Sequence, residues 1–309
     1  MKTPQFISKI KEFLESTPVP AFGISFAEFF RIYSGGISDI KIGKMAAGIS
    51  WAFFMSLFPL ILFLLSLLPY LPHYEELQEY ILTVLLSNIL PENVYGQVRS
   101  YIVETFIPNI ENLSPLTVLF SLIFATNGTH QLVDGFNHNQ VRRSFIKDYS
   151  VSLLITSLFI AALILSILGI YYAEVVTKLL NSEKNLSWIA ENLTAIISFV
   201  SFPLFYFLLL SGFYWLGTER IHRWVHALPG ALLTTVLFML VTYLFAIFLK
   251  NFARYNVLYG SIGTMIALMV WVNLNIIIIL LGNELNLSVR KMKNTKVKIE
   301  HSDPATPEP

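Results

Sequence analysis

Five polar side chains recur at helical spacing within one otherwise apolar stretch. Asn127, His130, Gln131, Asp134 and His138 follow one another in steps of three, one, three and four residues. These steps place all five on one face of an α-helix and leave small and apolar residues on the other. A histidine and a carboxylate on one face can transfer protons, and such a face can also line a polar cavity. The spacing fits equally a helix that emerges into the cytosol with a wetted face.

A second polar set lies nearer the C-terminus. Asn273 and Glu284 are eleven residues apart, which places them within about 20° of each other on a helix of 3.6 residues per turn. Asn275 and Asn286 share this spacing on a different face. Two polar faces on one apolar helix predict a helix at the centre of a bundle. Glu284 would lie at the depth of Asp134, either as a functional carboxylate or as one that fixes packing or topology.

Between these sets lies a short segment rich in histidine and arginine. Glu219, His222 and His226 stand at positions i, i+3 and i+7, a spacing that could gather three metal ligands. The segment offers no fourth ligand, so we predict no metal site and no cofactor. Arg220 and Arg223 fit better a basic patch that meets anionic lipid head groups. The predicted head-group contacts of the chain are Arg142, Arg143, Arg220 and Arg223.

Catalytic signatures are missing from the sequence. It carries no cysteine, which excludes disulfides, thiolate nucleophiles and iron–sulfur clusters. It also lacks the phosphate-binding, zinc-protease and serine-hydrolase motifs. Pro59 and Pro203 remove backbone donors within apolar stretches, so we predict helix kinks there, as in some transporters. We predict that the protein is not an enzyme.

The composition indicates which kind of structure positions these polar residues. Hydrophobic residues make up 55% of the chain and charged residues 13%, and the mean hydropathy is +0.62. A soluble domain this apolar would expose large greasy patches to water. Six stretches are long enough to cross a bilayer, and in lipid they must be helices because their backbone groups can pair only within the segment. The predicted spans are 46–70, 113–133, 149–172, 193–215, 227–249 and 259–287.

The 21 lysines and arginines are distributed unevenly among the loops. Most precede the first span or follow the second, fourth and sixth, whereas the first loop on the opposite side is acidic. By the positive-inside rule both termini are therefore cytoplasmic, and the protein is multi-pass. On the cytoplasmic side, Arg142 or Arg143 is placed to neutralise Glu284.

The remaining segments are amphipathic or polar. We predict an all-α membrane protein in three parts: interfacial amphipathic helices at 1–44, a six-helix transmembrane domain at 45–289, and a basic, then disordered, cytoplasmic tail at 290–309. Within the second part, apolar residues at helical spacing over 73–108, interrupted by Pro91, predict an extracytoplasmic helical hairpin.

Several of these stretches resemble the YihY/BrkB family in family order, from about residue 41 to 287. They are AAGISW at 46–51, SLFPL at 56–60, NGTHQLVDGFN at 127–137, HALPGA at 226–231, YGSIG at 259–263 and LGNELN at 281–286. Asn283 departs from the alanine that family members carry in the last element.

The resemblance implies a six-helix protein of the bacterial inner membrane, tied to envelope integrity and to lipid movement. We therefore expect a transporter or scaffold for a lipid or other amphiphile, with a cytoplasm-facing polar cleft between the second and sixth spans. The alternatives are a membrane hydrolase that uses His130, Asp134 and Glu284, and a structural or partner-binding membrane protein. Some family members carry a ribonuclease label, but this chain offers no basic RNA-binding domain. Expected partners are membrane lipids and envelope proteins, not nucleic acid.

Overall fold

Helices account for every regular element in the part of the chain that the structure describes. The structure is a computed structural model, and it describes residues 31, 34, 42–89, 92–110, 113–138, 144–180 and 203–302. The predicted all-α class is confirmed. The amphipathic helices predicted within 1–44 fall mostly outside the described residues, as do Arg142 and Arg143.

Five described helices are long and apolar enough to cross a membrane. They confirm five of the six predicted spans, with boundaries shifted by a few residues. The fourth span, predicted at 193–215, is described only from Pro203 onward, as the helix Pro203–Gly217. The five are Ile42–Tyr70, Pro115–Phe136, Phe145–Gly169, Trp224–Leu249 and Met265–Met292.

Large apolar side chains cover the outside of these helices. In each of the five spans, at most 39% of an apolar stretch of 18 residues is buried inside the protein. Phe58, Leu165 and Tyr243 are each more than half exposed. In water this exposure would cost free energy for every side chain, whereas lipid tails solvate the same surface. The protein is therefore a polytopic membrane protein.

The chain divides into two compact units. Unit 1 comprises Met1–Ser50, Val133–Arg142 and Pro203–Pro309, and unit 2 comprises Trp51–Leu132 and Arg143–Phe202. Helices α3 (Ile42–Leu67) and α8 (Pro115–Phe136) contribute residues to both units.

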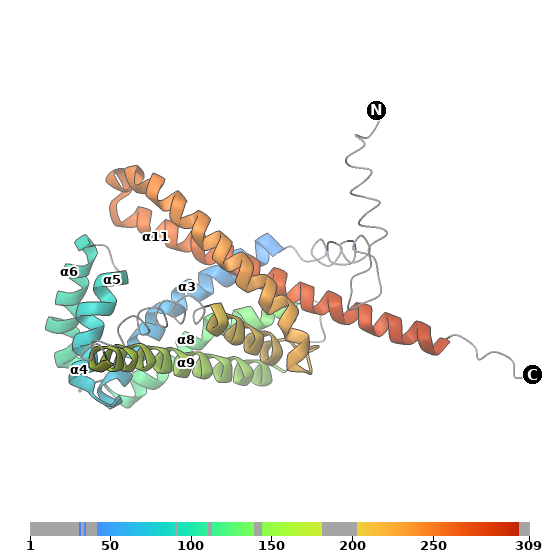
Figure 1. Ribbon diagram of the computed structural model, residues 1–309, viewed down its shortest axis with the longest axis horizontal. Helices are drawn as coiled ribbons and strands as arrows, with labels where there is room; N and C mark the ends of the chain where they lie inside the picture. Colours follow the sequence, from blue (N-terminus) through green and yellow to red (C-terminus); the bar gives the residue numbers. More distant parts are fainter. Residues whose placement is uncertain are drawn as a thin grey trace, which may run out of the picture. The chain divides into compact units, whose positions relative to one another are not determined.

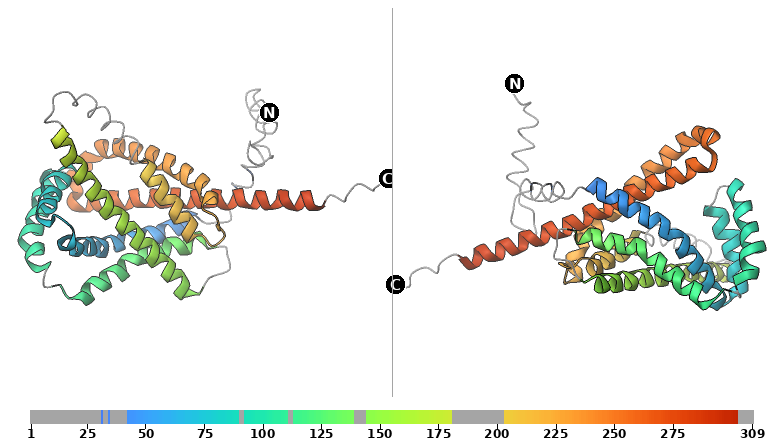
Figure 2. Two further views of the ribbon diagram at one scale, coloured as in Figure 1. Left: turned by 60° about the horizontal axis from the view of Figure 1, so that its bottom comes forward. Right: turned by 180° about the vertical axis from the view of Figure 1, so that it is seen from behind.

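Unit 1 is built on α11 (Leu228–Ser302), which turns back on itself. A straight helix of its 75 residues would be about 110 Å long. The backbone N–H of Gly230 nevertheless donates to Asn286 Oδ1 at 2.6 Å. The two arms therefore lie side by side, as Figures 1 and 2 show, and they carry the last two spans.

Glycine permits the close crossing of the two arms of α11. A Cβ at Gly282 would overlap the hydroxyls of Thr234 and Tyr214 and would lie 2.8 Å from the carbonyl oxygen of Gly230. A Cβ at Gly230 would overlap the carbonyl oxygen of Gly282. Any side chain at either position would force the arms apart.

In unit 2, α8 packs against α9 (Phe145–Leu180) through polar contacts within an apolar interface. The Thr156 hydroxyl donates to Thr129 Oγ1 at 2.9 Å, and the Tyr149 hydroxyl donates to the carbonyl oxygen of Ile123 at 2.9 Å. Hydrogen bonds between helices stabilise association in lipid, where the hydrophobic effect gives little help.

The predicted hairpin within 73–108 has two helical arms. The first comprises α4 (Tyr74–Tyr80), a π-helical turn at Ile81–Leu85 and α5 (Leu86–Ile89). The second comprises α6 (Glu92–Tyr101), a π-helical turn at Ile102–Phe106 and α7 (Ile107–Ile110). The two arms appear together in Figure 1.

The hairpin is tied to the far end of α9. His73 adopts a left-handed backbone conformation with φ of 56°, which turns the chain sharply into α4. Its Nδ1 lies 3.1 Å from the Tyr172 hydroxyl, and the rings of Tyr80 and Tyr171 meet edge to face at 5.6 Å.

At the C-terminal end the structure differs from the sequence prediction. The tail was predicted to be basic and then disordered over 290–309, but α11 stays helical to Ser302. The segment contains no glycine or proline before Pro304, and its lysines favour the negative end of the helix dipole. Low hydrophobicity alone therefore did not predict the structure of this segment, because the segment extends a helix that is already formed.

Candidate functional site

The polar face predicted on α8 is only partly buried, and we call it the open face of α8. Asn127 and His138 are exposed, and His130, Gln131 and Asp134 are half-buried. The residues predicted for the opposite face are all buried: Ala125, Gly128, Thr129, Leu132 and Phe136. The two-faced character of this helix is therefore confirmed.

The open face of α8 changes its chemistry along the helix. Phe120, Asn127 and Asp134 are spaced by seven residues, so they lie in one row, two turns apart. In the first half the large exposed side chains are apolar, although Thr117 is also exposed, and in the second half the side chains on this face are polar. The exposed apolar residues are Leu116, Leu119, Phe120 and Phe124, each 46% to 60% exposed. Asn127 lies about 18 Å from the start of α8, in the middle of a membrane-spanning length.

His130 is held against α9. Its Nδ1 lies 3.4 Å from the Ser152 hydroxyl, and its ring meets the rings of Phe145 and Tyr149 edge to face at 5.5 and 5.6 Å. One edge of the imidazole is therefore engaged, and its position on the face is fixed by aromatic contacts.

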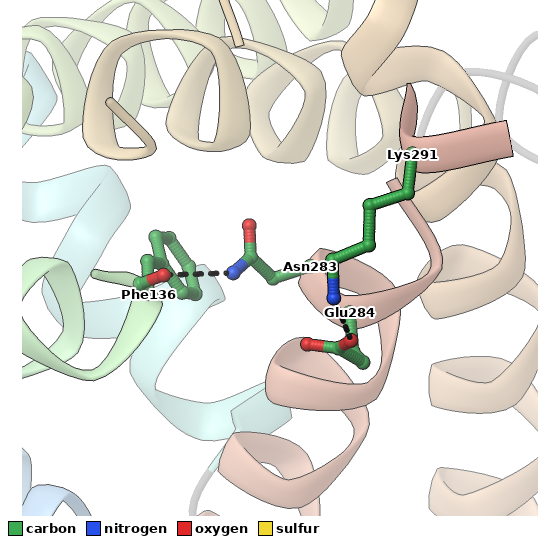
Figure 3. A network of polar contacts seen from close by, with 4 residues as sticks. All are labelled: Phe136, Asn283, Glu284 and Lys291. Atoms are coloured by element: carbon green, nitrogen blue, oxygen red, sulfur yellow. Dashed lines mark hydrogen bonds and ion pairs between the residues drawn. The ribbon is translucent and has the colours of Figure 1, made fainter. Parts of the chain in front are cut away.

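Glu284 is buried, with an exposed fraction of 2%. Figure 3 shows the Lys291 side chain reaching back toward it, with Nζ 4.0 Å from the carboxylate. Lys291 lies two turns further along the same helix, on the same face. The arginines predicted to neutralise Glu284 fall outside the described residues, and the described countercharge is Lys291.

Asn283 points to the other side of the helix, toward the end of α8. Its Nδ2 donates to the carbonyl oxygen of Phe136 at 3.2 Å, and its Oδ1 accepts from the Thr218 hydroxyl at 2.7 Å. The first of these bonds is drawn in Figure 3. Asn283, which stands where family members carry an alanine, thus adds two hydrogen bonds that join three segments of unit 1.

Asn137 plays a similar part that sequence reasoning missed. Its Nδ2 donates to the carbonyl oxygen of Gly217 at 2.8 Å, and its Oδ1 accepts from the backbone N–H of Glu219 at 2.9 Å. The side chain therefore pairs backbone groups where the helix Pro203–Gly217 ends and can no longer pair them itself. The signal was a single asparagine directly after the last apolar turn of α8.

Asn286 completes the set by pairing the start of α11. Its Oδ1 accepts from Gly230, and its Nδ2 donates to the carbonyl oxygen of Ala227 at 3.2 Å. We call Asn137, Asn283 and Asn286 the asparagine network. All three are buried, and all three join segments of unit 1 that are far apart in sequence. The network is a packing device, because its polar atoms bond the protein itself.

Asn273 also bonds within unit 1. Its Nδ2 donates to the Ser50 hydroxyl of α3 at 3.1 Å, and the side chain is half-buried. Of the two faces predicted on the last span, Asn275 and Asn286 on one and Glu284 on the other are buried. The polar residues of this span are therefore largely engaged, unlike those of α8.

The two prolines occupy different contexts. Pro59 lies inside α3, which continues as a helix to Leu67. Pro203 is the first described residue of its helix, so the kink predicted there falls at the edge of the described part.

The segment after Gly217 carries the predicted basic patch. Arg220 and Arg223 are both exposed. Among the described residues, no group of three or more histidine, aspartate or glutamate side chains is arranged to hold a metal ion.

Comparison with known proteins places the chain in a family. The family model described as Virulence factor BrkB matches residues 34–307, nearly the whole chain. The chain belongs to the BrkB family. Within it, the open polar face of α8 and the asparagine network occupy the stretches that carried the resemblance.

Two relatives of this chain are membrane proteins by name. The chain is 25% identical over 286 residues to a UPF0761 membrane protein of Chlorobium phaeobacteroides, covering 89% of this chain and 60% of the relative. A UPF0761 membrane protein of Haemophilus influenzae is 21% identical, with 85% and 95% covered.

A third relative carries a different name. It is the putative ribonuclease-like protein YfkH of Bacillus subtilis, which is 27% identical over 251 residues, with 80% of this chain and 90% of the relative covered. No solved structure matches this chain.

Proposed function

We propose that this BrkB-family protein binds a lipid or other amphiphile along the open face of α8, as a transporter or scaffold, and is not an enzyme. The observation that supports this is the row of polar side chains from Asn127 to His138, which is exposed or half-buried in the C-terminal half of α8. Polar groups exposed to lipid tails are costly, so such a row favours contact with water or with a polar head group.

The face matches an amphiphile in both chemistry and length. Phe120 and Phe124 offer an apolar surface to tails, and the polar half offers hydrogen bonds to a head group. From Phe120 to Asp134 the helix rises about 21 Å, which is somewhat more than one leaflet of a hydrocarbon core about 30 Å thick.

The structure narrows the residues in this proposal. In the cleft predicted from the sequence, the last span lined the cavity together with α8, through Asn273 and Glu284. Glu284 is buried beside Lys291, and Asn273 bonds Ser50, so both support the fold. The proposed ligand contacts are therefore Asn127, Gln131 and Asp134, with His130 as a positioned neighbour.

The proposal includes an orientation. The positive-inside distribution supports cytoplasmic termini, and the resemblance supports a location in the bacterial inner membrane. The polar half of α8 then faces the cytoplasmic leaflet, where an amphiphile would enter with its head group.

Photocrosslinking of a lipid tests this proposal. In vesicles of phosphatidylethanolamine and phosphatidylglycerol, a phospholipid with a photoreactive group near its head group is expected to crosslink to peptides of α8. Asn127→Leu together with Asp134→Leu should lower the yield about fivefold, because two polar contacts are lost. Ser150→Leu is the matched control, since it makes the same polar-to-leucine change at an exposed residue of α9, outside the proposed face.

The same vesicles separate the alternatives. Faster transfer of a fluorescent lipid between leaflets than in protein-free vesicles identifies a transporter, and crosslinking without transfer identifies a scaffold. Crosslinks that avoid α8, or a yield unchanged by the double substitution, would refute the proposal. In that case the hydrolase and the structural interpretation of the family remain.

A further inference from the structure

The segment that follows the helix Pro203–Gly217 has the features of a surface that meets lipid head groups. It lies in unit 1 and ends in a single 3₁₀ turn at Trp224–Ala227 that leads into α11. Arg220, His222, Arg223, Trp224 and Val225 are all exposed. Such a mixture of arginine, tryptophan and aliphatic side chains is typical of the interface between lipid tails and water.

Two tryptophans are held firmly at this segment. Trp224 donates its indole N–H to the Ser211 hydroxyl at 2.7 Å, yet 44% of the residue is exposed. Trp215 donates to the carbonyl oxygen of His222 at 3.4 Å and is 42% exposed. Because their N–H groups bond the protein, the rings present mainly apolar surface, which anchors the segment at the depth of the head groups.

A third arginine lies nearby on α11. Asn286 bonds the carbonyl oxygen of Ala227, and Arg290 is one helical turn further along the same face of α11. Arg290 therefore lies on the side of α11 that packs against the 3₁₀ turn.

The guanidinium of Arg290 is incompletely paired. Its Nη1 atom is buried and makes no hydrogen bond. A buried charged donor without an acceptor costs free energy, and such a group in a native structure needs an explanation. If the guanidinium of Arg290 turned toward an anion, Nη1 would lose no hydrogen bond, and the anion would be the acceptor that Nη1 lacks.

We propose that Arg220, Arg223 and Arg290 form a binding site for the phosphate of an anionic phospholipid in the cytoplasmic leaflet. Guanidinium groups bind phosphate oxygens in pairs. The three arginines carry a positive charge, and the two indoles hold the site at the level of the phosphates. The proposal does not depend on the function proposed for α8, because it concerns a lipid that docks at the rim of unit 1.

Lipid binding by the purified full-length protein tests this site. Native mass spectrometry in detergent would compare phosphatidylglycerol with phosphatidylcholine of the same acyl chains, and inorganic phosphate would be the competitor. The wild type is expected to prefer phosphatidylglycerol by about 100-fold, because each of the three arginines contributes about fivefold. Arg220→Gln together with Arg223→Gln should lower the preference about 25-fold, and Arg290→Gln should lower it about fivefold.

Controls keep the test decisive. Lys147→Gln removes an exposed cation from the first turn of α9 and should leave the preference unchanged. Arg220 and Arg223 are exposed, so their substitution should leave the melting temperature unchanged. Arg223→Lys should retain part of the preference because it keeps the charge and loses the fork.

Three outcomes would overturn the site. The first is a wild type that binds both lipids equally. The second is an unchanged preference after the double substitution. The third is inorganic phosphate that displaces phosphatidylglycerol at equal concentration, which would indicate a site for a free anion and not for a membrane lipid.

Discussion

Replacing Gly282 with alanine should lower the free energy of unfolding by about 3 kcal/mol or more. The new Cβ would overlap the hydroxyls of Thr234 and Tyr214 and would lie 2.8 Å from the carbonyl oxygen of Gly230. The arms of α11 would have to separate, which would also stretch the bond between the Tyr214 hydroxyl and the carbonyl oxygen of Ile279, now 2.8 Å long. Thermal unfolding in detergent, followed by circular dichroism, measures the effect.

Gly212→Ala is the matched control for this substitution. Gly212 also lies inside an apolar helix, Pro203–Gly217, but a Cβ there would meet nothing within 4 Å. Alanine favours a helix over glycine by up to about 1 kcal/mol, so this variant should be as stable as the wild type or more stable. Equal melting temperatures for the two variants would show that the arms do not cross as closely as described.

Asn137→Ala should destabilise unit 1 by about 2–6 kcal/mol. It leaves the carbonyl oxygen of Gly217 and the backbone N–H of Glu219 without their partner, and each buried group left unpaired costs about 1–3 kcal/mol. The end of the helix Pro203–Gly217 should loosen first, which hydrogen exchange at Thr218 and Glu219 would detect as faster exchange.

Its neighbour His138 provides the control. His138 is exposed, so His138→Ala should change neither stability nor exchange at Glu219. Asn137→Asp keeps the acceptor for Glu219 and loses the donor to Gly217, so it should fall between the two. An Asn137→Ala variant with wild-type exchange at Glu219 would mean that the asparagine network does not hold this segment.

The membrane fold could be predicted from the sequence because it depends on length and hydropathy alone. Five predicted spans coincide with described helices, since any apolar run of this length must be helical in lipid. The helical end at Ser302 was missed because composition reports hydrophobicity, whereas a helix can continue outward from a packed start.

The polar face of α8 was also predictable, since helical periodicity sorts the two sides of one helix. Contacts between helices were not. The pairing of Asn137 with Gly217 depends on the register of two segments 80 residues apart, which periodicity does not encode. For the same reason the spacing of Asn273 and Glu284 predicted a polar face, but it did not predict that both side chains make contacts within the protein.

The polar half of α8 is expected to be open to water or to head groups inside the membrane. The chain contains no cysteine, so a single introduced cysteine would be its only thiol for a maleimide to label. In inside-out vesicles, a water-soluble maleimide should label Asn127→Cys and Asp134→Cys rapidly and should leave Phe120→Cys and Phe124→Cys unlabelled, although those residues are 46% and 60% exposed. Labelling of Asn127→Cys as slow as that of Phe124→Cys would contradict the account.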